Sequence, residues 1–357
     1  MEELVTKRIA VIPGDGIGKE VVPVGVACVT AALERHGVRF EWQDFDWSSD
    51  YYLEHGRMMP EDALGTLAGF DAIYLGAVGM PGVSDAESLW GLLIPIRRRF
   101  NQYINLRPVK VLPGVAPPVP AAAGLDLMIV RENSEGEYSD VGAHIVAGTA
   151  DEYVTQETRF SRKGIERVAE YAFGLAAARG RKVTSATKSN GIIHTMPFWD
   201  SIVEEVAGRY ADRVSLEPVL IDALAAKLVL QPGSFDVIVG SNLFGDILSD
   251  LAGAIAGSIG AAPSANLNPE GAFPSMFEPV HGSAPDIAGK GIANPIGQVW
   301  SGAMMLDHLG HPEAAADLVA AFESALGLGI RTADLGGTAT TEEMGAAILA
   351  NLEPAHG

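Results

Sequence analysis

Short apolar segments alternate with longer amphipathic segments along most of this 357-residue chain, and the alternation restricts the folds that it can adopt. Residues 8–12, 72–77 and 236–240 are short and mostly apolar, which is typical of buried strands. The segments between such strands have the pattern of amphipathic helices. The sequence therefore predicts an α/β fold with a largely parallel sheet. Further strands are expected over 125–131, 182–187 and 215–221, and helices over 20–36, 88–99, 162–179 and 198–210.

Three segments depart from this alternation. Residues 141–158 contain many strand-favouring residues without a regular period, so we expect an irregular strand pair or an arm. The proline-rich residues 113–120 fit a crossover between domains, and they fit a rigid surface loop equally well. Residues 251–262 are apolar, short and rich in small residues, which predicts a buried helix and not a membrane span.

The composition fits a folded, acidic protein. Hydrophobic residues make up 48% of the chain and charged residues 20%, so disorder is not expected. A formal net charge of -20 argues against nucleic acid and anionic membrane surfaces as partners. The length predicts about two domains.

The single cysteine, Cys28, cannot form an internal disulfide, and a small buried hydrophobe is its expected role. No signal-peptide pattern follows Met1, and no apolar run reaches the length of a membrane-spanning helix. We therefore expect a cytoplasmic protein.

The segment SNLFGDILSD, residues 241–250, places Asp246 and Asp250 in an otherwise apolar run. Their spacing is about one helical turn, so both carboxylates project from the same face of a helix. Two like charges on a partly buried face repel unless a proton or a cation lies between them. Carboxylate oxygens with room for water and substrate favour Mg²⁺ or Mn²⁺. The simpler alternative is that Asp246 caps the helix and Asp250 faces solvent.

Basic side chains stand out against the acidic background as candidate anion sites. Arg97, Arg98 and Arg99 are consecutive, so on a helix they point in three directions and cannot all serve one site. We expect Arg98 and Arg99 on a solvated face. Arg107 follows, and Arg131 ends an apolar strand, where the ligand sites of parallel sheets lie. The guanidinium fork suits a carboxylate, to which it donates two parallel hydrogen bonds.

Three further polar residues are candidates for proton transfer or metal binding. Lys188 directly follows an expected strand, and a buried lysine beside a cation can act as a general base. Tyr138 closes the segment RENSEGEY and could act as a general acid. Asp222 also follows a strand and could complete a three-aspartate metal site. Taken alone, each residue is more often structural.

Two further segments could contact a nucleotide. Residues 14–18, GDGIG, lie between an expected strand and helix, where backbone N–H groups can approach a ligand. The spacing differs from the G-x-G-x-x-G fingerprint, so a tight structural turn is an equal alternative. The loop over 278–290, EPVHGSAPDIAGK, is rich in glycine, proline and charged residues, which is typical of a functional loop. Its Asp286 could bind both hydroxyls of an adenosine ribose and would repel a 2′-phosphate, which favours NAD over NADP.

Six motifs occur in order along the chain: PGDGIG, NLRP, RENSEGEY, TKSN, NLFGDILSDLAG and EPVHGSAPDIAGKGIANP. Together they resemble the β-decarboxylating dehydrogenases, the isocitrate and isopropylmalate dehydrogenase family, over nearly the whole chain. The resemblance implies a two-domain α/β fold of the isopropylmalate dehydrogenase type, with a large mixed, mostly parallel sheet flanked by helices, and not a Rossmann fold. It implies a discontinuous cofactor-binding domain over 1–108 and 258–357. Residues 109–257 would form the substrate, metal and dimerisation domain, with an arm near 141–158.

The resemblance also implies roles for individual residues. Tyr138 and Lys188 match the catalytic acid and base. Family members are homodimers with shared active sites, so Lys188 and Asp222 would act in the site of the partner subunit. The implied substrate-binding residues are Arg97, Arg107 and Arg131, and the implied ligands of Mg²⁺ or Mn²⁺ are Asp222, Asp246 and Asp250. The implied NAD-binding positions are Ile12, Gly14, Asn190, His281, Gly282, Ser283, Ala284, Asp286 and Asn294. K⁺ is a further candidate cofactor.

Within the family, three segments are most similar to tartrate dehydrogenases and decarboxylating D-malate dehydrogenases. They are residues 45–52 with 58–60, the segment SLWGLL over 88–93, and RENSEGEY. The expected reaction is the NAD-dependent and metal-dependent oxidation, with β-decarboxylation, of a small 2-hydroxy diacid, either D-malate or tartrate.

Two alternatives stay open at this point. A 3-isopropylmalate dehydrogenase needs an apolar pocket at substrate C3, which Leu92, Leu93 and Ile94 could supply, whereas Trp90 would shrink it. A regulatory homologue without catalysis would typically lack metal aspartates or the lysine, and this chain keeps all of them. The expected partners are a small 2-hydroxy diacid and a second copy of the chain, with no nucleic acid and no membrane.

Overall fold

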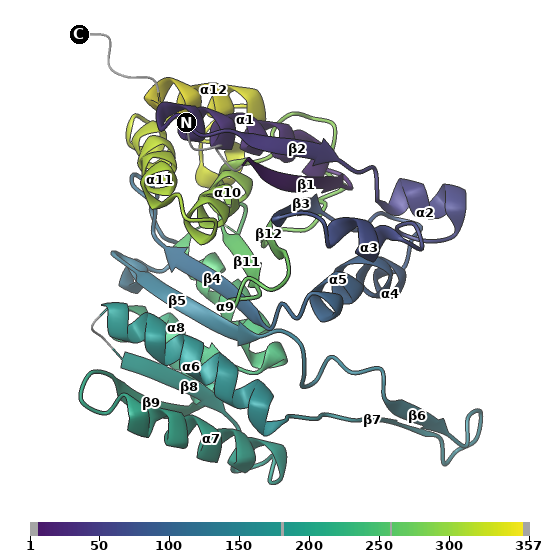
Figure 1. Ribbon diagram of the computed structural model, residues 1–357. Helices are drawn as coiled ribbons and strands as arrows, with labels where there is room; N and C mark the ends of the chain where they lie inside the picture. Colours follow the sequence, from purple (N-terminus) through teal and green to yellow (C-terminus); the bar gives the residue numbers. More distant parts are fainter. Residues whose placement is uncertain (1–5, 180–181, 258, 353–357) are drawn as a thin grey trace. The chain divides into compact units, whose positions relative to one another are not determined.

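The computed structural model describes residues 6–179, 182–257 and 259–352. In it the chain forms two compact units, in which strands alternate with helices as expected (Figure 1). The first unit contains Met1–Gln102, Lys110–Ala123 and Gly253–Gly357, and the second contains Tyr103–Val109 and Gly124–Ala252. The expected domains differ from these units over 103–108, 110–123 and 253–257, and residue 258 lies outside the described residues. The assignment of a cofactor domain and a substrate domain therefore stays a prediction.

The strands of the first unit lie in the order β2 (Phe40–Asp44), β1 (Lys7–Gly14), β3 (Ala72–Ala77), β12 (Ser275–Pro279) and β11 (Pro263–Leu267). β1 pairs in parallel with β2 and β3, and β12 pairs in parallel with β3. β11 pairs antiparallel with β12, which makes this part of the sheet mixed. Every residue of β3 is buried, as expected for a strand that is covered on both faces.

Four long helices pack against one another in the first unit: α1 (Gly18–Arg35), α10 (Ile296–His308), α11 (Pro312–Gly327) and α12 (Thr341–Leu352). Helix α10 also packs against β11 and β12 and so covers the sheet. The shorter helices are α2 (Ser49–His55), α3 (Ala63–Leu67), α4 (Asp85–Ser88) and α5 (Ile94–Arg99), and 3₁₀ turns form at Pro120–Ala122 and Ala333–Leu335.

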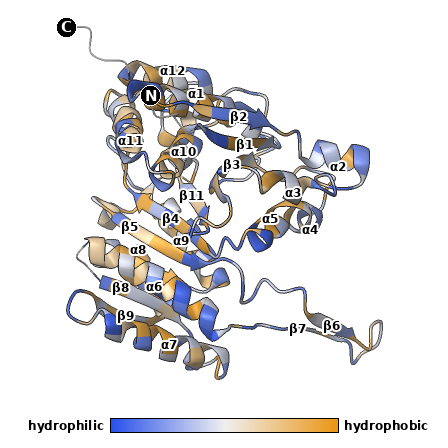
Figure 2. Cartoon of the chain, in the orientation of Figure 1, coloured by the Kyte–Doolittle hydropathy of each residue, from blue (hydrophilic) through white to orange (hydrophobic). Residues whose placement is uncertain are grey.

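A buried apolar cluster fills the space beside β1, β3 and β12. It includes Ile12, Ile73, Leu92, Phe100 and Met276. Figure 2 shows that the long helices carry hydrophobic and hydrophilic residues together, as amphipathic helices do. On α1, burial raises the pKa of the fully buried Cys28 thiol to about 12, so this residue behaves as the small hydrophobe that we expected.

The strands of the second unit lie in the order β4 (Ile104–Lys110), β5 (Asp126–Glu132), β10 (Val237–Gly240), β8 (Lys182–Thr187) and β9 (Ser215–Leu220). β5, β10, β8 and β9 are parallel neighbours. Helix α6 (Arg162–Arg179) packs on β5, β8 and β10, while α7 (Thr195–Arg209) packs on α6 and β9. Helix α8 (Ile221–Leu230) directly follows β9, and α9 (Asn242–Ala256) follows β10, with a 3₁₀ turn at Pro232–Ser234.

A two-stranded antiparallel pair, β6 (Gly142–Ile145) and β7 (Tyr153–Gln156), forms a sheet of its own. In Figure 1 it projects away from the helices of its own unit. Tyr153 and Val154 are 56% and 70% exposed. The expected strand pair over 141–158 is therefore confirmed, whereas its role as a dimer arm stays a prediction.

Two expected helices differ from the structure. The helix expected over 88–99 contains a π-helical turn, Leu89–Leu93, between α4 and α5. This wider turn ends two residues before Pro95. In a regular α-helix the ring of Pro95 would clash with the carbonyl of Gly91, which lies within the wider turn. The helix expected over 251–262 ends at Ala256, because Gly257 adopts a φ of 115°. Residue 258 lies outside the described residues, and the expectation is wrong for residues 259–262, which are not helical.

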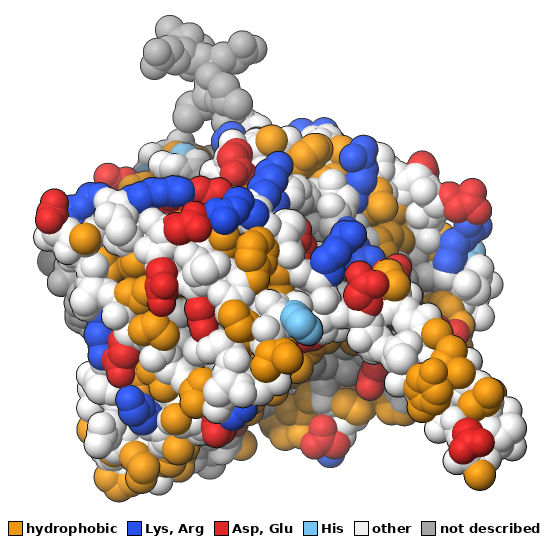
Figure 3. All heavy atoms as spheres, turned by 90° about the horizontal axis from the view of Figure 1, so that it is seen from below, with side chains coloured by type: hydrophobic (Ala, Val, Ile, Leu, Met, Phe, Trp, Pro, Cys, Tyr) orange, Lys and Arg blue, Asp and Glu red, His pale blue; other side chains and the backbone are white. Residues whose placement is uncertain are grey.

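The expected α/β fold, with a large mixed and mostly parallel sheet flanked by helices, is confirmed. Figure 3 shows acidic and basic side chains interspersed over one face of the molecule. A search of the described residues finds no helix with the length and apolar character needed to cross a membrane.

Candidate active site

Asp246 lies at the centre of a polar cluster in the second unit. Its Oδ1 pairs with Arg131 Nη1 and lies 3.3 Å from Arg107 Nη1. Its Oδ2 accepts a hydrogen bond of 2.9 Å from the Tyr138 hydroxyl. Three side chains that we predicted to bind substrate or transfer a proton therefore converge on one predicted metal ligand.

Arg131 is held in place at the end of β5, where the residue is only 4% exposed. Its Nε and Nη2 donate to Asn242 Oδ1, at 3.0 and 2.7 Å, where α9 begins. Helix α9 can approach the strand this closely because residue 245 is glycine, and a Cβ on Gly245 would lie 2.6 Å from Arg131 Cβ. The buried guanidinium thus fixes Asn242 and Asp246 in one geometry.

Arg107 supplies the positive charge between the two carboxylates of α9. Its Nη1 lies 3.3 Å from Asp246 Oδ1 and 3.3 Å from Asp250 Oδ1, and it donates to Ser249 Oγ at 2.6 Å. We expected a proton or a cation between these like charges, and the cation here is a guanidinium of the chain itself. The buried Nε of Arg107 has no hydrogen-bond partner among the described residues, which leaves a donor for a ligand.

The acidic face of α9 is partly open to solvent. The side chains of Asp246 and Asp250 are 31% and 60% exposed. Asp246 lies inside the helix, which begins at Asn242, so the alternative that Asp246 is a cap is wrong. Asp250 does face solvent, but its ion pair with Arg107 also makes it part of the cluster.

Burial and neighbouring charges shift two pKa values in the cluster. Burial raises the pKa of the Tyr138 phenol, and the Asp246 carboxylate raises it further, against the opposing effect of Arg131 and Arg107. The phenol therefore keeps its proton at neutral pH and can donate it. Burial also raises the pKa of Asp250, with Arg107 lowering it and Asp246 raising it.

Lys188 and Asp222 form a separate pair in the second unit. Lys188, directly after β8, donates a hydrogen bond of 2.6 Å to Asp222 Oδ1 in the first turn of α8. This hydrogen bond is the main cause that lowers the pKa of Asp222. Among the described residues, no three acidic, histidine or cysteine side chains converge as possible metal ligands. A single chain therefore does not bring Asp222 to Asp246 and Asp250.

Arg97 lies in the last turn of α5, in the first unit. Its Nη2 donates to Glu278 Oε1 at 2.7 Å, and the same oxygen accepts a hydrogen bond of 2.7 Å from Asn266 Nδ2. Arg97 is mostly buried, whereas Arg98 and Arg99 are exposed as expected. A buried carboxylate thus orients Arg97.

The predicted NAD-binding loop follows β12 in the first unit. The carbonyl of Ser283 accepts a hydrogen bond of 2.9 Å from the Ile17 N–H, and Asn294 Nδ2 donates to Asp334 at 2.9 Å. Asp286 is exposed, as a group that binds ribose hydroxyls must be. The loop also contains His281, Gly282 and Ala284; burial lowers the pKa of His281, and Ala284 has a φ of 41°.

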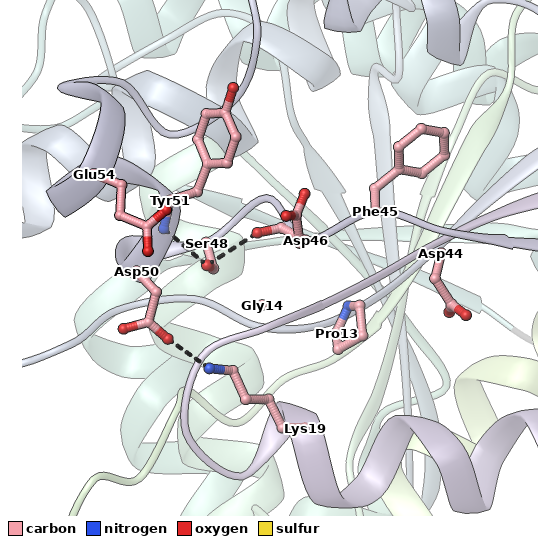
Figure 4. A pocket seen from close by; sticks show the side chains of 10 residues that line it. All are labelled: Pro13, Gly14, Lys19, Asp44, Phe45, Asp46, Ser48, Asp50, Tyr51 and Glu54. Atoms are coloured by element: carbon pink, nitrogen blue, oxygen red, sulfur yellow. Dashed lines mark hydrogen bonds and ion pairs between the residues drawn. The ribbon is translucent and has the colours of Figure 1, made fainter.

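Besides Asn294, which follows the loop, three predicted NAD-binding residues lie outside it. Ile12 is fully buried in the core cluster, so its side chain packs within the unit and does not face a ligand. Asn190 is exposed in the turn after β8. Gly14 lines a pocket of about 530 Å³ beside β1 and β2 (Figure 4). Its walls disfavour a phosphate, because they carry the carboxylates of Asp44, Asp46, Asp50 and Glu54, and the ammonium of Lys19, which also lines the pocket, pairs with Asp50 at 2.6 Å.

Three backbone N–H groups of the glycine turn over 14–18, those of Asp15, Ile17 and Gly18, are hydrogen-bonded within the protein. The Asp15 N–H donates to the Ala77 carbonyl at 2.7 Å, and the Gly18 N–H donates to the Asp15 carbonyl at 2.9 Å. The Ile17 N–H is bound to Ser283, as described above. These contacts favour the tight structural turn over a phosphate-binding loop.

Sequence reasoning missed the groups that orient the predicted residues. Asn242 and Ser249 lie in the same motif as Asp246, and their spacing along one helix could have indicated them. Glu278 opens the motif EPVHG but contacts Arg97, which lies 181 positions away in the sequence. No local pattern reveals such a partner.

The chemistry of these groups fits a divalent cation and a dinucleotide. Asp246 and Asp250 offer hard oxygen ligands, and they already share one cation, Arg107. Asp286 offers an exposed carboxylate within a loop whose backbone is hydrogen-bonded to Ile17 at Ser283.

A model of the isocitrate/isopropylmalate dehydrogenase family matches residues 8–348. The chain belongs to this family. The resemblance that the six motifs indicate, and the dehydrogenase class that it implies, are confirmed at the level of the family.

Two curated relatives match almost the full chain. A probable tartrate dehydrogenase/decarboxylase of Bacillus subtilis (strain 168) is 53% identical, with 94% of this chain and 95% of the relative covered. A decarboxylating D-malate dehydrogenase of Escherichia coli (strain K12) is also 53% identical, with 96% and 98% covered. The expected similarity to this branch of the dehydrogenase family is therefore confirmed.

Solved structures of the family share the fold. An isocitrate dehydrogenase from Methylococcus capsulatus has a TM-score of 0.88 at 33% identity and covers 98% of this chain and 100% of its own. A β-decarboxylating dehydrogenase from Thermococcus kodakarensis has a TM-score of 0.78 at 40% identity, with 97% and 96% covered. The isopropylmalate dehydrogenase-like fold that we expected is thus confirmed.

Proposed function

We propose that the chain is an NAD-dependent and divalent-metal-dependent dehydrogenase that oxidises and decarboxylates a small 2-hydroxy diacid, D-malate or tartrate. The observation that carries this proposal is the cluster around Asp246, where two arginines and a protonated tyrosine meet a pair of carboxylates on α9. The 53% identity to tartrate and D-malate dehydrogenases supports the choice of substrate.

The arginines would bind the two carboxylates of the substrate. Arg107 keeps a buried, unpartnered Nε, and Arg97 has one as well, so each retains a donor for an anion. Arg131 would act from a fixed position, because Asn242 and Asp246 hold its guanidinium. Against a net charge of -20, these arginines make the local field attractive to a dianion.

Asp246 and Asp250 of one subunit, with Asp222 of a second copy, would hold the cation. A bound Mg²⁺ or Mn²⁺ would polarise the substrate hydroxyl and the ketone formed from it, and bound NAD would accept the hydride from C2. Lys188, likewise from the second copy, would receive the hydroxyl proton. The resulting 2-keto acid loses CO₂, and Tyr138 would donate its proton to the enolate carbon.

This scheme makes the enzyme a homodimer with shared active sites. We further propose that it acts in the cytoplasm. The pairing of Lys188 with Asp222, apart from the other two aspartates, supports the sharing. Asp286 supports NAD over NADP, since its carboxylate would repel a 2′-phosphate. K⁺ stays a prediction from the family resemblance.

The burial of two leucines argues against 3-isopropylmalate as the substrate. Leu92 and Leu93 are 0% and 8% exposed and belong to the core cluster of the first unit. These two are thus not available to line an apolar pocket for an isopropyl group, whereas Ile94, the third residue considered for that pocket, is half-buried. Trp90 remains exposed on the same segment and fits a smaller substrate better.

Initial rates of NADH formation test the proposal. With Mn²⁺ and NAD, we expect the highest kcat/KM for D-malate or a tartrate isomer, compared with 3-isopropylmalate and isocitrate. A chelator should abolish the rate, and added Mn²⁺ should restore it. If 3-isopropylmalate were turned over fastest, the substrate assignment would be wrong. If none of the four compounds gave NADH, the proposed function would be wrong.

A further inference from the structure

The side chain of Glu20 binds the backbone of the loop that we propose to hold NAD. Its Oε1 accepts a hydrogen bond of 2.6 Å from the Gly289 N–H, and its Oε2 accepts one of 2.9 Å from the Gly291 N–H. Glu20 lies in the first turn of α1, far from these residues in the sequence. One carboxylate therefore ties two loop amides to the start of a long helix.

The conformation of the loop depends on these bonds. Gly289 and Gly291 have φ values of 77° and 65°, which turn the two N–H groups toward the same carboxylate. Bonds from neutral amides to a charged acceptor are stronger than those between neutral groups. An exposed loop with two left-handed glycines would otherwise sample many conformations.

The glycine turn before α1 holds the other end of the loop. The Ile17 N–H donates to the Ser283 carbonyl at 2.9 Å, and a Cβ on Gly16 would lie 2.1 Å from that oxygen. The turn and Glu20 thus attach the loop at Ser283 and at Gly289 with Gly291. Asp286 lies between these two attachments.

We propose that Glu20 is a positioning residue for the cofactor. It fixes the backbone after Asp286, while the Ile17 N–H holds the backbone before it at Ser283, so that less conformational freedom is lost when NAD binds. The motif PGDGIG, together with Glu20, acts as the platform for this loop and not as a phosphate cradle. The inference rests on the proposed function, in that NAD is the ligand of the loop.

The test compares Glu20→Gln with Glu34→Gln. Glutamine keeps the size of the side chain but loses its charge, and its amide NH₂ would face one of the two N–H donors. Glu34 lies on the same helix and is exposed, so it controls for the loss of one negative charge on α1. Glu20→Asp is a second variant, which keeps the charge but is too short to reach both amides.

Two measurements are made on each protein. Calorimetric titration of the metal-free protein with NAD gives the Kd, and hydrogen exchange without NAD reports the protection of the Gly289 and Gly291 amides. For both Glu20 variants we expect about tenfold weaker binding of NAD and faster exchange at these amides. The Glu34→Gln protein should match the wild type in both.

The two readouts separate this inference from the proposed function. Unchanged NAD affinity or unchanged exchange in both Glu20 variants would overturn the role of Glu20. If the wild-type protein itself did not bind NAD, the proposed function would fail. Faster exchange of the Gly289 and Gly291 amides in the Glu20 variants would still show that Glu20 holds the loop.

Discussion

At the scale of single residues, the site depends on how the Asp246 carboxylate is shared among Arg107, Arg131 and Tyr138. The sequence predicted that Asp246 and Asp250 lie on one helix face, with a proton or a cation between them. It did not reveal that the cation within the chain is Arg107, because Arg107 lies on β4, more than a hundred positions away in the sequence. Local spacing determines which carboxylates are adjacent, whereas tertiary structure determines what they bind.

Arg131→Lys should disrupt the cluster without adding or removing charge. A lysine ammonium cannot bind Asn242 and Asp246 with the same planar geometry, so one of these partners loses its hydrogen bond. We expect the free energy of unfolding in urea to fall by about 1–3 kcal/mol. Arg99→Lys, on the exposed side of α5, should change it by less than about 0.5 kcal/mol. Equal unfolding midpoints for the two variants would contradict the structural role of Arg131.

At the scale of secondary-structure elements, the periodic patterns predicted most of the fold. The strands over 72–77 and 182–187 and the helix over 162–179 match the structure to the residue. The π-helical turn at Leu89–Leu93 was missed, because a single wide turn leaves the apolar pattern nearly unchanged. The sequence also did not show which strands are neighbours, since β12 pairs with β3 across about two hundred positions.

Helix α9 provides a matched test of close packing. Gly245→Ala would place a Cβ 2.6 Å from Arg131 Cβ and force α9 away from β5. We expect a loss of about 1–3 kcal/mol in the free energy of unfolding, together with lower activity. Gly253→Ala, on the same helix, meets its nearest atom only at 3.8 Å, so it should be neutral or stabilising by up to about 1 kcal/mol. Similar destabilisation by both substitutions would argue against the close approach.

At the scale of the whole molecule, the proposed enzyme is a dimer with shared active sites. One chain contains all the predicted catalytic and metal-binding residues, yet Asp222 and Lys188 pair with each other and lie outside the carboxylate cluster. The exposed side chains of Tyr153 and Val154 on β7, with Val141 and Val146 at the ends of β6, give the second unit an apolar surface suited to a partner. Neither feature could be read from the sequence without the family resemblance, because no local pattern distinguishes a residue that serves its own chain from one that serves another.

The activity of hybrid dimers tests this account most directly. Lys188→Met and Asp246→Asn proteins, each inactive alone, are co-expressed with different affinity tags, and the hybrid is purified through both tags. A shared active site gives the hybrid one site with Lys188 from one chain and Asp246 from the other, so we predict about half of the wild-type rate of NADH formation per dimer. An inactive hybrid, with an active wild-type protein prepared in the same way, would contradict the account.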